Sequence, residues 1–193
     1  PSWLLTLADR DIAAGMAEVI KCGFIADPQI LAVSAGKNVS SLRSNPELMS
    51  ELIYRSVAVK ASVVSADFKE SFAREALNYG HTLGHAIEKF AKYELRHGEA
   101  IAIGLVYAAE LAHARSLISA EDLALHRSLL STLGLPITYA RDAWQKLAPM
   151  LALDKKSRGN TIRFVALSGI GATTRLEDLT SAELDAAYER ISL

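Results

Sequence analysis

The sequence predicts a mainly α-helical domain, a helical bundle with one small β-hairpin near residues 161–176. Three observations predict it. Apolar residues recur at helical spacing in several segments, capping signals begin and end many of these segments, and β-branched and aromatic residues gather in one short stretch. The 193 residues are half apolar and have the length of one ordinary domain, so residues 1–193 are expected to form a single unit.

The first half of the chain contains three predicted helices with clear starting signals. From about Arg10 to Ile25, apolar residues recur every three or four positions, which is typical of a helix with one buried face. Asp27-Pro28 starts a second helix and Asn45-Pro46-Glu47 starts a third, because the aspartate or asparagine caps the first turn and proline fits its first position. The third helix is expected to end near Val59.

The second half contains two further capped helices and the hairpin. Ser119-Ala-Glu-Asp122 and Thr180-Ser-Ala-Glu183 are capping boxes, and Gly134 followed by Pro136 ends the first of these helices. The run from Thr161 to Leu167 favours a strand, with residues 172–176 as its partner. Residues 34–44 and 154–160 are interpreted as loops.

Composition excludes several classes of function. The net charge of −1 lacks the basic excess of a nucleic-acid binder. A single cysteine, Cys22, excludes an internal disulfide and a thiolate-only zinc site, so any metal needs nitrogen and oxygen ligands, which fits a cytoplasmic protein. The longest apolar run, residues 100–109, is about half a membrane span. No nucleic acid or membrane is therefore expected as a partner.

Three of the five histidines fall within seventeen positions. They belong to a segment from Arg74 to Glu88, which reads Arg-Glu-Ala-Leu-Asn-Tyr-Gly-His-Thr-Leu-Gly-His-Ala-Ile-Glu, and to His97-Gly98-Glu99. His81 and His85 are four residues apart, so on a helix they share one face and could bind one metal ion, although this spacing often occurs by chance. The glycines at 80, 84 and 98 let a ligand or a backbone approach closely.

Charged residues elsewhere leave two interpretations open. Glu18 and Lys21 lie one turn apart in an apolar helix, either as an exposed ion pair worth about 0.3 kcal/mol or as buried charges that need partners such as a metal. Lys60, Arg74 and the sequence Asp154-Lys-Lys156 form either solvated surface or a cationic lining for an anionic substrate.

Four blocks of the sequence resemble, in the same order, the C-terminal half of the 3-dehydroquinate synthase family, across residues 1 to about 171. They are Gly15-Met-Ala-Glu-Val-Ile-Lys-Cys-Gly23, the segment from Arg74 to Glu88, His97-Gly-Glu-Ala-Ile-Ala-Ile-Gly104 and Asp154-Lys-Lys156. The resemblance implies a helical fold that iron-type alcohol dehydrogenases share. It also implies a metal- and NAD-dependent lyase of the shikimate pathway, which leads to the aromatic amino acids.

The implied reaction converts the sugar acid phosphate DAHP to 3-dehydroquinate and phosphate. It proceeds through transient oxidation by NAD, elimination of phosphate, reduction and an intramolecular aldol closure. The metal implied is Zn²⁺, or Co²⁺ in its place. The family further implies a homodimer in the cytoplasm.

The resemblance assigns roles to matching positions. Glu18, His81 and His97 match the metal ligands, whereas His85 does not and is left to the substrate. Lys60 and Arg74 match residues that hold the substrate carboxylate, and Lys21 lies near the reacting hydroxyls. The positions near the phosphate are Asn78, His85 and either Lys155 or Lys156, of which Lys156 is favoured.

The chain lacks the part of the family that binds most of the NAD. No glycine-rich GxGxxG turn follows a strand, and the chain begins at Pro1 and enters helical periodicity almost at once. We therefore expect a piece of a longer protein, without its N-terminal NAD-binding domain and with negligible turnover by itself.

Three alternatives are weighed against this interpretation. A sugar phosphate cyclase of the valiolone or inosose type would share the metal ligands, but Arg74, Asn78 and His85 together favour DAHP. An iron- or glycerol-type alcohol dehydrogenase would usually use an aspartate where this chain has Glu18. A noncatalytic helical binding module would leave the histidines merely packed or capped.

Overall fold

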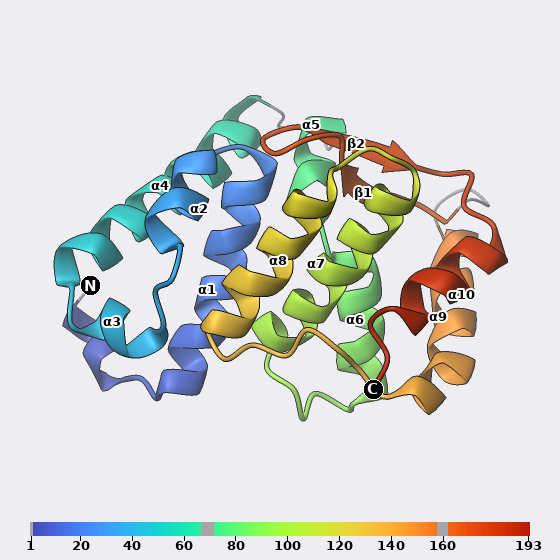
Figure 1. The fold of residues 1–193 in the computed structure, drawn as a ribbon, viewed down its shortest axis with the longest axis horizontal. Coiled ribbons are helices and arrows are strands. Elements are labelled where there is room, and N and C mark those ends of the chain that lie inside the picture. The colour runs from blue at the N-terminus through green and yellow to red at the C-terminus, as the bar shows by residue number, and fades with distance from the viewer. Residues whose placement is uncertain (1, 67–71, 158–161) are drawn as a thin grey trace.

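The computed structural model describes residues 2–66, 72–157 and 162–193, and within this part the chain is mainly helical (Figure 1). The α-helices are α1 (Asp9–Ile25), α2 (Pro28–Ser34), α3 (Val39–Arg43), α4 (Pro46–Ala66), α5 (Phe72–Glu75), α6 (His81–Phe90), α7 (His97–Ala114), α8 (Ala120–Thr132), α9 (Trp144–Ser157) and α10 (Ser181–Glu189). Short 3₁₀ helices cover Ser2–Thr6, Ala76–Asn78 and Arg141–Ala143. The strands are β1 (Phe164–Leu167) and β2 (Thr173–Leu176). The predicted fold class, a helical bundle with a small hairpin, is confirmed.

Helix α7 forms the centre of the molecule. It packs against α1, α6, α8, α10 and β1 (Figure 1), and every residue from Gly98 to Ala112 is buried. A helix that is apolar on all sides requires such surroundings, because each of its faces must be covered. Its apolar run is therefore a core helix, and no described helix has the length and apolar character needed to cross a membrane.

Local capping signals correctly predicted the starts of α2, α4, α8 and α10. The side chain of Asp27 accepts a hydrogen bond from the backbone of Gln29 at the start of α2. Ser119 and Thr180 each form a complete capping box at the starts of α8 and α10. Helix α1 also agrees with its predicted range to within one residue.

The hairpin lies where the β-branched residues predicted it. β1 and β2 pair antiparallel, with Phe164 opposite Leu176 and Leu167 opposite Thr173. All four residues of β1 are buried against α7, whereas most of β2 is only half-buried. The predicted first residue of this strand, Thr161, lies outside the described residues.

Three boundaries predicted from the sequence were wrong. The loop expected at residues 34–44 contains α3, which is capped by the Asn38 side chain. Helix α4 continues past Val59 to Ala66, because no glycine or proline ends it there. The loop expected from Asp154 is helical as far as Ser157, as the end of α9, and the rest of that loop lies outside the described residues.

Glycines allow the central helices to approach closely. A Cβ atom added to Gly98 would lie 1.9 Å from the carbonyl oxygen of Ala14 in α1, and one added to Gly104 would lie 1.9 Å from the carbonyl oxygen of Gly80. Gly80 also has a φ of +79°, a backbone conformation that residues other than glycine rarely adopt. The first contact holds the start of α7 against α1, and the second holds the start of α6 against α7.

Candidate metal centre

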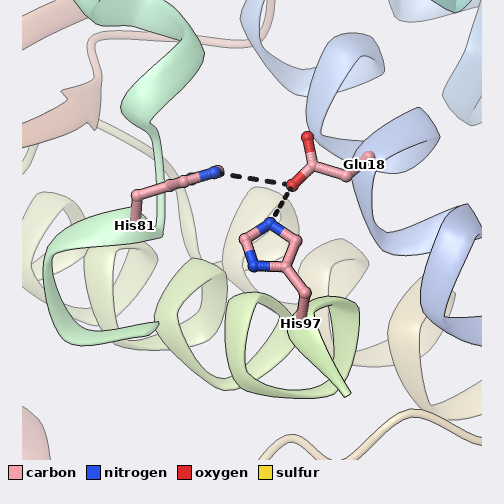
Figure 2. Close-up of side chains that lie close together, drawn as sticks. All are labelled: Glu18, His81 and His97. Carbon is pink, nitrogen blue, oxygen red and sulfur yellow. Dashed lines mark ion pairs between the residues drawn. The ribbon is translucent and has the colours of Figure 1, made fainter. Parts of the chain in front are cut away.

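Three side chains from three helices converge on one point. Glu18 extends from the middle of α1, while His81 and His97 are the first residues of α6 and α7 (Figure 2). Glu18 Oε1 lies 3.5 Å from His81 Nε2 and 3.3 Å from His97 Nε2. Atoms that share a zinc ion at bond lengths of about 2.0–2.1 Å lie about 3.3 Å apart in tetrahedral geometry. The spacing therefore suits one bound cation.

Hydrogen bonds at the far side of each ring aim a lone pair at Glu18. His81 Nδ1 lies 3.1 Å from the carbonyl oxygen of Tyr79, and His97 Nδ1 lies 3.1 Å from Glu88 Oε1. Because a carbonyl and a carboxylate only accept hydrogen bonds, Nδ1 of each ring is the donor, and a neutral ring then keeps its lone pair on Nε2. Each Nε2 is then a free acceptor that faces Glu18 Oε1.

Glu18 Oε1 and the two Nε2 atoms face one another without a hydrogen-bond donor among them. Glu18 Oε1 is buried and has no hydrogen-bond partner among the described residues. A buried carboxylate oxygen beside two imidazole lone pairs is unfavourable unless a cation or a proton lies among them. The three side chains therefore fit a divalent metal, and one carboxylate with two imidazoles leaves coordination positions open for substrate or water, as in catalytic zinc sites.

Lys21 keeps Glu18 ionised from the other side. Its ammonium lies 2.6 Å from Glu18 Oε2 and donates to the Leu77 carbonyl oxygen at 2.7 Å, and only 4% of the residue is exposed. Burial raises the pKa of the Glu18 carboxyl, but the charge and hydrogen bond of Lys21 oppose this effect, and the pKa lies below its usual value. Of the two interpretations left open from the sequence, the ion pair is present, but its lysine is buried rather than exposed.

Burial has the opposite effect on the imidazole of His81, whose pKa it lowers. Burial and the Lys21 ammonium lower the pKa of His81 to about 4, although Glu18 and the Tyr79 carbonyl oppose them. The ring is therefore neutral near pH 7, the form in which histidine coordinates metals.

A cleft of about 940 Å³ opens over the cluster. Its described lining includes seven of the residues to which the resemblance assigns roles: Glu18, Lys21, Lys60, Arg74, Asn78, His81 and His97. Lys60, Arg74 and Asn78 are exposed, so their polar ends can meet a ligand there. The cleft thus has a cluster of acceptors at one place and cationic side chains around it.

Two predicted residues are not among the described lining of the cleft. His85 is exposed beside the cluster, with its ring centre 5.0 Å from that of His81 and 6.0 Å from that of His97. The backbone of Lys156 belongs to α9, and its side chain, like that of Lys155, lies outside what the structure describes. Their roles near the phosphate stay predictions.

The structure also identifies neighbours that were given no role from the sequence. Glu88 contacts His97, while Glu75 and Arg163 line the cleft. Glu88 stands in the histidine motif, three residues after His85, and this spacing could have pointed to it. Arg163 pairs with Glu177 at 3.0 Å, and no local signal in the sequence linked it to this site.

Comparisons with known proteins identify the family of this chain. Residues 15–157 match the family model described as 3-dehydroquinate synthase C-terminal. The chain is 49% identical over 189 residues to the 3-dehydroquinate synthase of Paenarthrobacter aurescens, covering 98% of this chain and 52% of that protein. It is 47% identical over 191 residues to that of Corynebacterium glutamicum, covering 98% and 52%. The chain thus spans about half the length of the curated relatives it matches.

Two solved structures share the fold. ValA, the 2-epi-5-epi-valiolone synthase from Streptomyces hygroscopicus solved with NAD⁺ and Zn²⁺ bound, superposes with a TM-score of 0.88 at 26% identity, covering 99% of this chain and 54% of that one. A 2-deoxy-scyllo-inosose synthase complexed with carbaglucose-6-phosphate, NAD⁺ and Co²⁺ gives a TM-score of 0.72 at 24% identity, covering 96% and 53%, which supports the fold alone.

Proposed function

The chain belongs to the 3-dehydroquinate synthase family, and we propose that it is the metal- and substrate-binding half of an enzyme that converts DAHP to 3-dehydroquinate and phosphate. The observation that supports this most is the convergence of Glu18, His81 and His97, with an unpartnered carboxylate oxygen, at the edge of a cleft with cationic side chains. A noncatalytic module has no need for such an arrangement.

Glu18, His81 and His97 would hold the cation, Zn²⁺ or Co²⁺. The cation would supply a Lewis acid that polarises a substrate hydroxyl. The chain's own contribution is to fix both imidazoles through Tyr79 and Glu88, so that their lone pairs already point toward Glu18 before any ligand arrives. These side chains then lose less conformational entropy when the cation binds.

The cationic side chains suit a substrate with two anionic groups. Arg74 can bind a planar carboxylate through two parallel N–H groups, and Lys60 can add a second charge. Asn78 and His85, together with Lys156, are proposed to contact the phosphate. A volume of about 940 Å³ lies within the range of small-molecule sites, roughly 300–1,000 Å³.

Lys21 is proposed to contact the reacting hydroxyls. An ammonium has three N–H groups. Glu18 and the Leu77 carbonyl engage two of them among the described residues. The third can donate to a hydroxyl in the cleft, which Lys21 lines.

The remaining half of the enzyme is proposed to supply the NAD site. The relatives are about twice as long as this chain, and ValA was solved with NAD⁺ bound. We propose that NAD binds mainly to an N-terminal domain that faces the cleft, that this chain by itself turns over negligibly, and that the complete enzyme is a homodimer.

Metal binding provides the first test. Titration of the metal-free chain with Zn²⁺ is expected to give one tight site per chain, which is lost in Glu18→Gln and in His97→Ala. His113→Ala is the matched control, because His113 lies in the same helix as His97 and away from the cluster. A chain that binds no zinc, or whose binding survives both substitutions, would contradict the proposal.

Activity provides the second test. We would fuse the chain to the N-terminal half of the Paenarthrobacter aurescens relative and measure release of phosphate from DAHP in the presence of NAD⁺ and Zn²⁺. Release is expected with the fusion and not with its Arg74→Ala variant. Turnover of a sugar phosphate that lacks a carboxylate, with none of DAHP, would instead indicate a cyclase of the valiolone or inosose type. The 47–49% identity to 3-dehydroquinate synthases, against 26% to ValA, favours DAHP.

A further inference from the structure

His97 lies between two carboxylates that compete for its single proton. Nε2 is 3.3 Å from Glu18 Oε1, and Nδ1 is 3.1 Å from Glu88 Oε1. The Glu88 side chain is only 12% exposed, in α6, and Glu88 is one of the last residues before the loop that leads into α7. This carboxylate is therefore shielded from water and directed at the outer edge of the ring.

The choice between the two carboxylates decides whether His97 can bind a metal. A neutral imidazole carries one N–H, and the other nitrogen is the acceptor. A proton on Nε2 would donate to Glu18 Oε1, which would satisfy the buried oxygen and close the cluster without a metal. A proton on Nδ1 donates to Glu88 and leaves the Nε2 lone pair free. The hydrogen-bond geometry favours the second state, because Glu18 Oε1 has no hydrogen-bond partner among the described residues.

We propose that Glu88 is a positioning residue, which holds the proton of His97 on Nδ1 and so keeps Nε2 available to the metal. This inference rests on the proposed metal site. The two histidines differ in this respect, because His81 donates to the backbone carbonyl of Tyr79, a neutral acceptor that no side-chain substitution removes. A carboxylate partner also makes the ring a better electron donor to a metal. Removing such a partner of a metal-binding histidine typically lowers metal affinity or activity by about 10–100-fold.

A second arrangement of the same residues has to be distinguished. Ligand atoms of His85, Glu88 and His97 also lie within 4.8 Å of one another, so Glu88 could itself be a ligand for a cation on the outer side of His97. Such a cation would need the lone pair of Nδ1, which the hydrogen bond to Glu88 occupies with a proton. The geometry therefore favours the positioning role, and the number of bound ions separates the two.

The experiment compares Glu88→Gln and Glu88→Ala with the unchanged chain. Gln keeps an acceptor oxygen but loses the charge, whereas Ala loses both. Glu94→Gln is the matched control, since Glu94 is exposed and lies in the loop between α6 and α7. Nitrogen-15 NMR of the metal-free chains near pH 8.5, about two units above the usual histidine pKa, reports which nitrogen of each ring is protonated. His81 serves as the internal reference in every spectrum.

The expected result is a shift of the His97 proton toward Nε2 in Glu88→Ala, with His81 unchanged. Zinc affinity should fall about 10–100-fold in Glu88→Ala and less in Glu88→Gln, with no change in Glu94→Gln. An unchanged tautomer and affinity in Glu88→Ala would overturn the proposal, as would a second bound zinc ion that Glu88→Ala removes. Failure of the proposed function appears separately, as absent zinc binding in the unchanged chain, because the tautomer is measured without metal.

Discussion

Replacing Gly98 with alanine tests whether the close contact between α1 and α7 sets the geometry of the metal cluster. The added Cβ would lie 1.9 Å from the Ala14 carbonyl oxygen and 2.5 Å from its carbon. Both are backbone atoms, so no rotation of a side chain relieves the overlap. The two helices must move apart by more than about 1 Å to restore a normal contact, since carbon and oxygen atoms pack at roughly 3.3 Å or more.

The expected cost follows from two opposing terms. Overpacking of a tight interface costs about 1–3 kcal/mol, and this contact lies at the severe end. Alanine returns up to about 1 kcal/mol through its higher helix propensity. A net loss of about 2 kcal/mol is expected, or about 4–8 °C in melting temperature for a chain of this size. Because Glu18 lies one turn beyond Ala14, the 3.3 Å separation of Glu18 Oε1 and His97 Nε2 should widen as well.

The assay measures urea unfolding of the metal-free chain and its zinc affinity in parallel. Metal sites tolerate errors of only about 0.2 Å in ligand distance, so zinc affinity should fall at least about tenfold. Gly15→Ala is the matched control in α1, because its added Cβ has no neighbour within 4 Å, and it should be neutral or stabilising by up to about 1 kcal/mol. Equal stability and zinc affinity in Gly98→Ala and the unchanged chain would refute the reasoning.

Three further substitutions test the polar groups of the core and their partners. Burial lowers the pKa of His126 to about 4, so below about pH 6.5 the unfolded state takes up a proton that the folded state refuses, and stability should fall by up to about 3 kcal/mol between pH 6.5 and 4. Urea unfolding should show that stability falls less between pH 7 and pH 5 in His126→Gln than in the unchanged chain. His81, whose pKa is also lowered, contributes to the fall in both chains. An equal fall in the two chains would contradict the assignment of this pH dependence to His126. Glu110 is buried in α7 and binds Arg127 at 2.6 Å and Arg190 at 2.8 Å, so Glu110→Ala should cost roughly 2–3 kcal/mol, less than a fully buried pair because both arginines reach solvent. Arg190→Ala should cost less in the same unfolding assay, since Glu110 keeps Arg127, and the reverse order would show that the carboxylate does not link the two arginines.

The features predicted correctly from the sequence are mostly local ones. Ser119 and Thr180 predict the starts of their helices, because a capping box is formed by residues only three positions apart. The missed elements have weaker or conflicting signals, although α3 does have a capping side chain, that of Asn38. Helix α3 is only five residues long, and α9 contains Pro149, which locally argues against a helix. Tertiary packing overrides that local preference, and a single sequence does not reveal it.

The site illustrates the same division between local and long-range information. The spacing of His81 and His85 predicted a shared helical face, and their ring centres lie 5.0 Å apart. That spacing does not show which ring faces Glu18, because Glu18 comes from another helix more than sixty residues away in the sequence. Only the packing of α1 against α7 brings His97 rather than His85 to Glu18 Oε1. The resemblance to a family carried this long-range information, whereas periodicity did not.

The glycines connect the packing to the chemistry. Next to histidines, Gly80, Gly84 and Gly98 could leave room for either a ligand or a backbone, and the structure shows a neighbouring helix packed against each of them. An added Cβ would meet Leu105 at Gly80, Ile101 at Gly84 and Ala14 at Gly98, each closer than 3.0 Å. All three contacts are between helices, and two of them join α6 to α7, whose first residues are His81 and His97. Gly80 and Gly98, which meet backbone atoms, thus set the distances between the ligand-bearing helices, and a substitution at either should reduce metal affinity although neither is a proposed ligand.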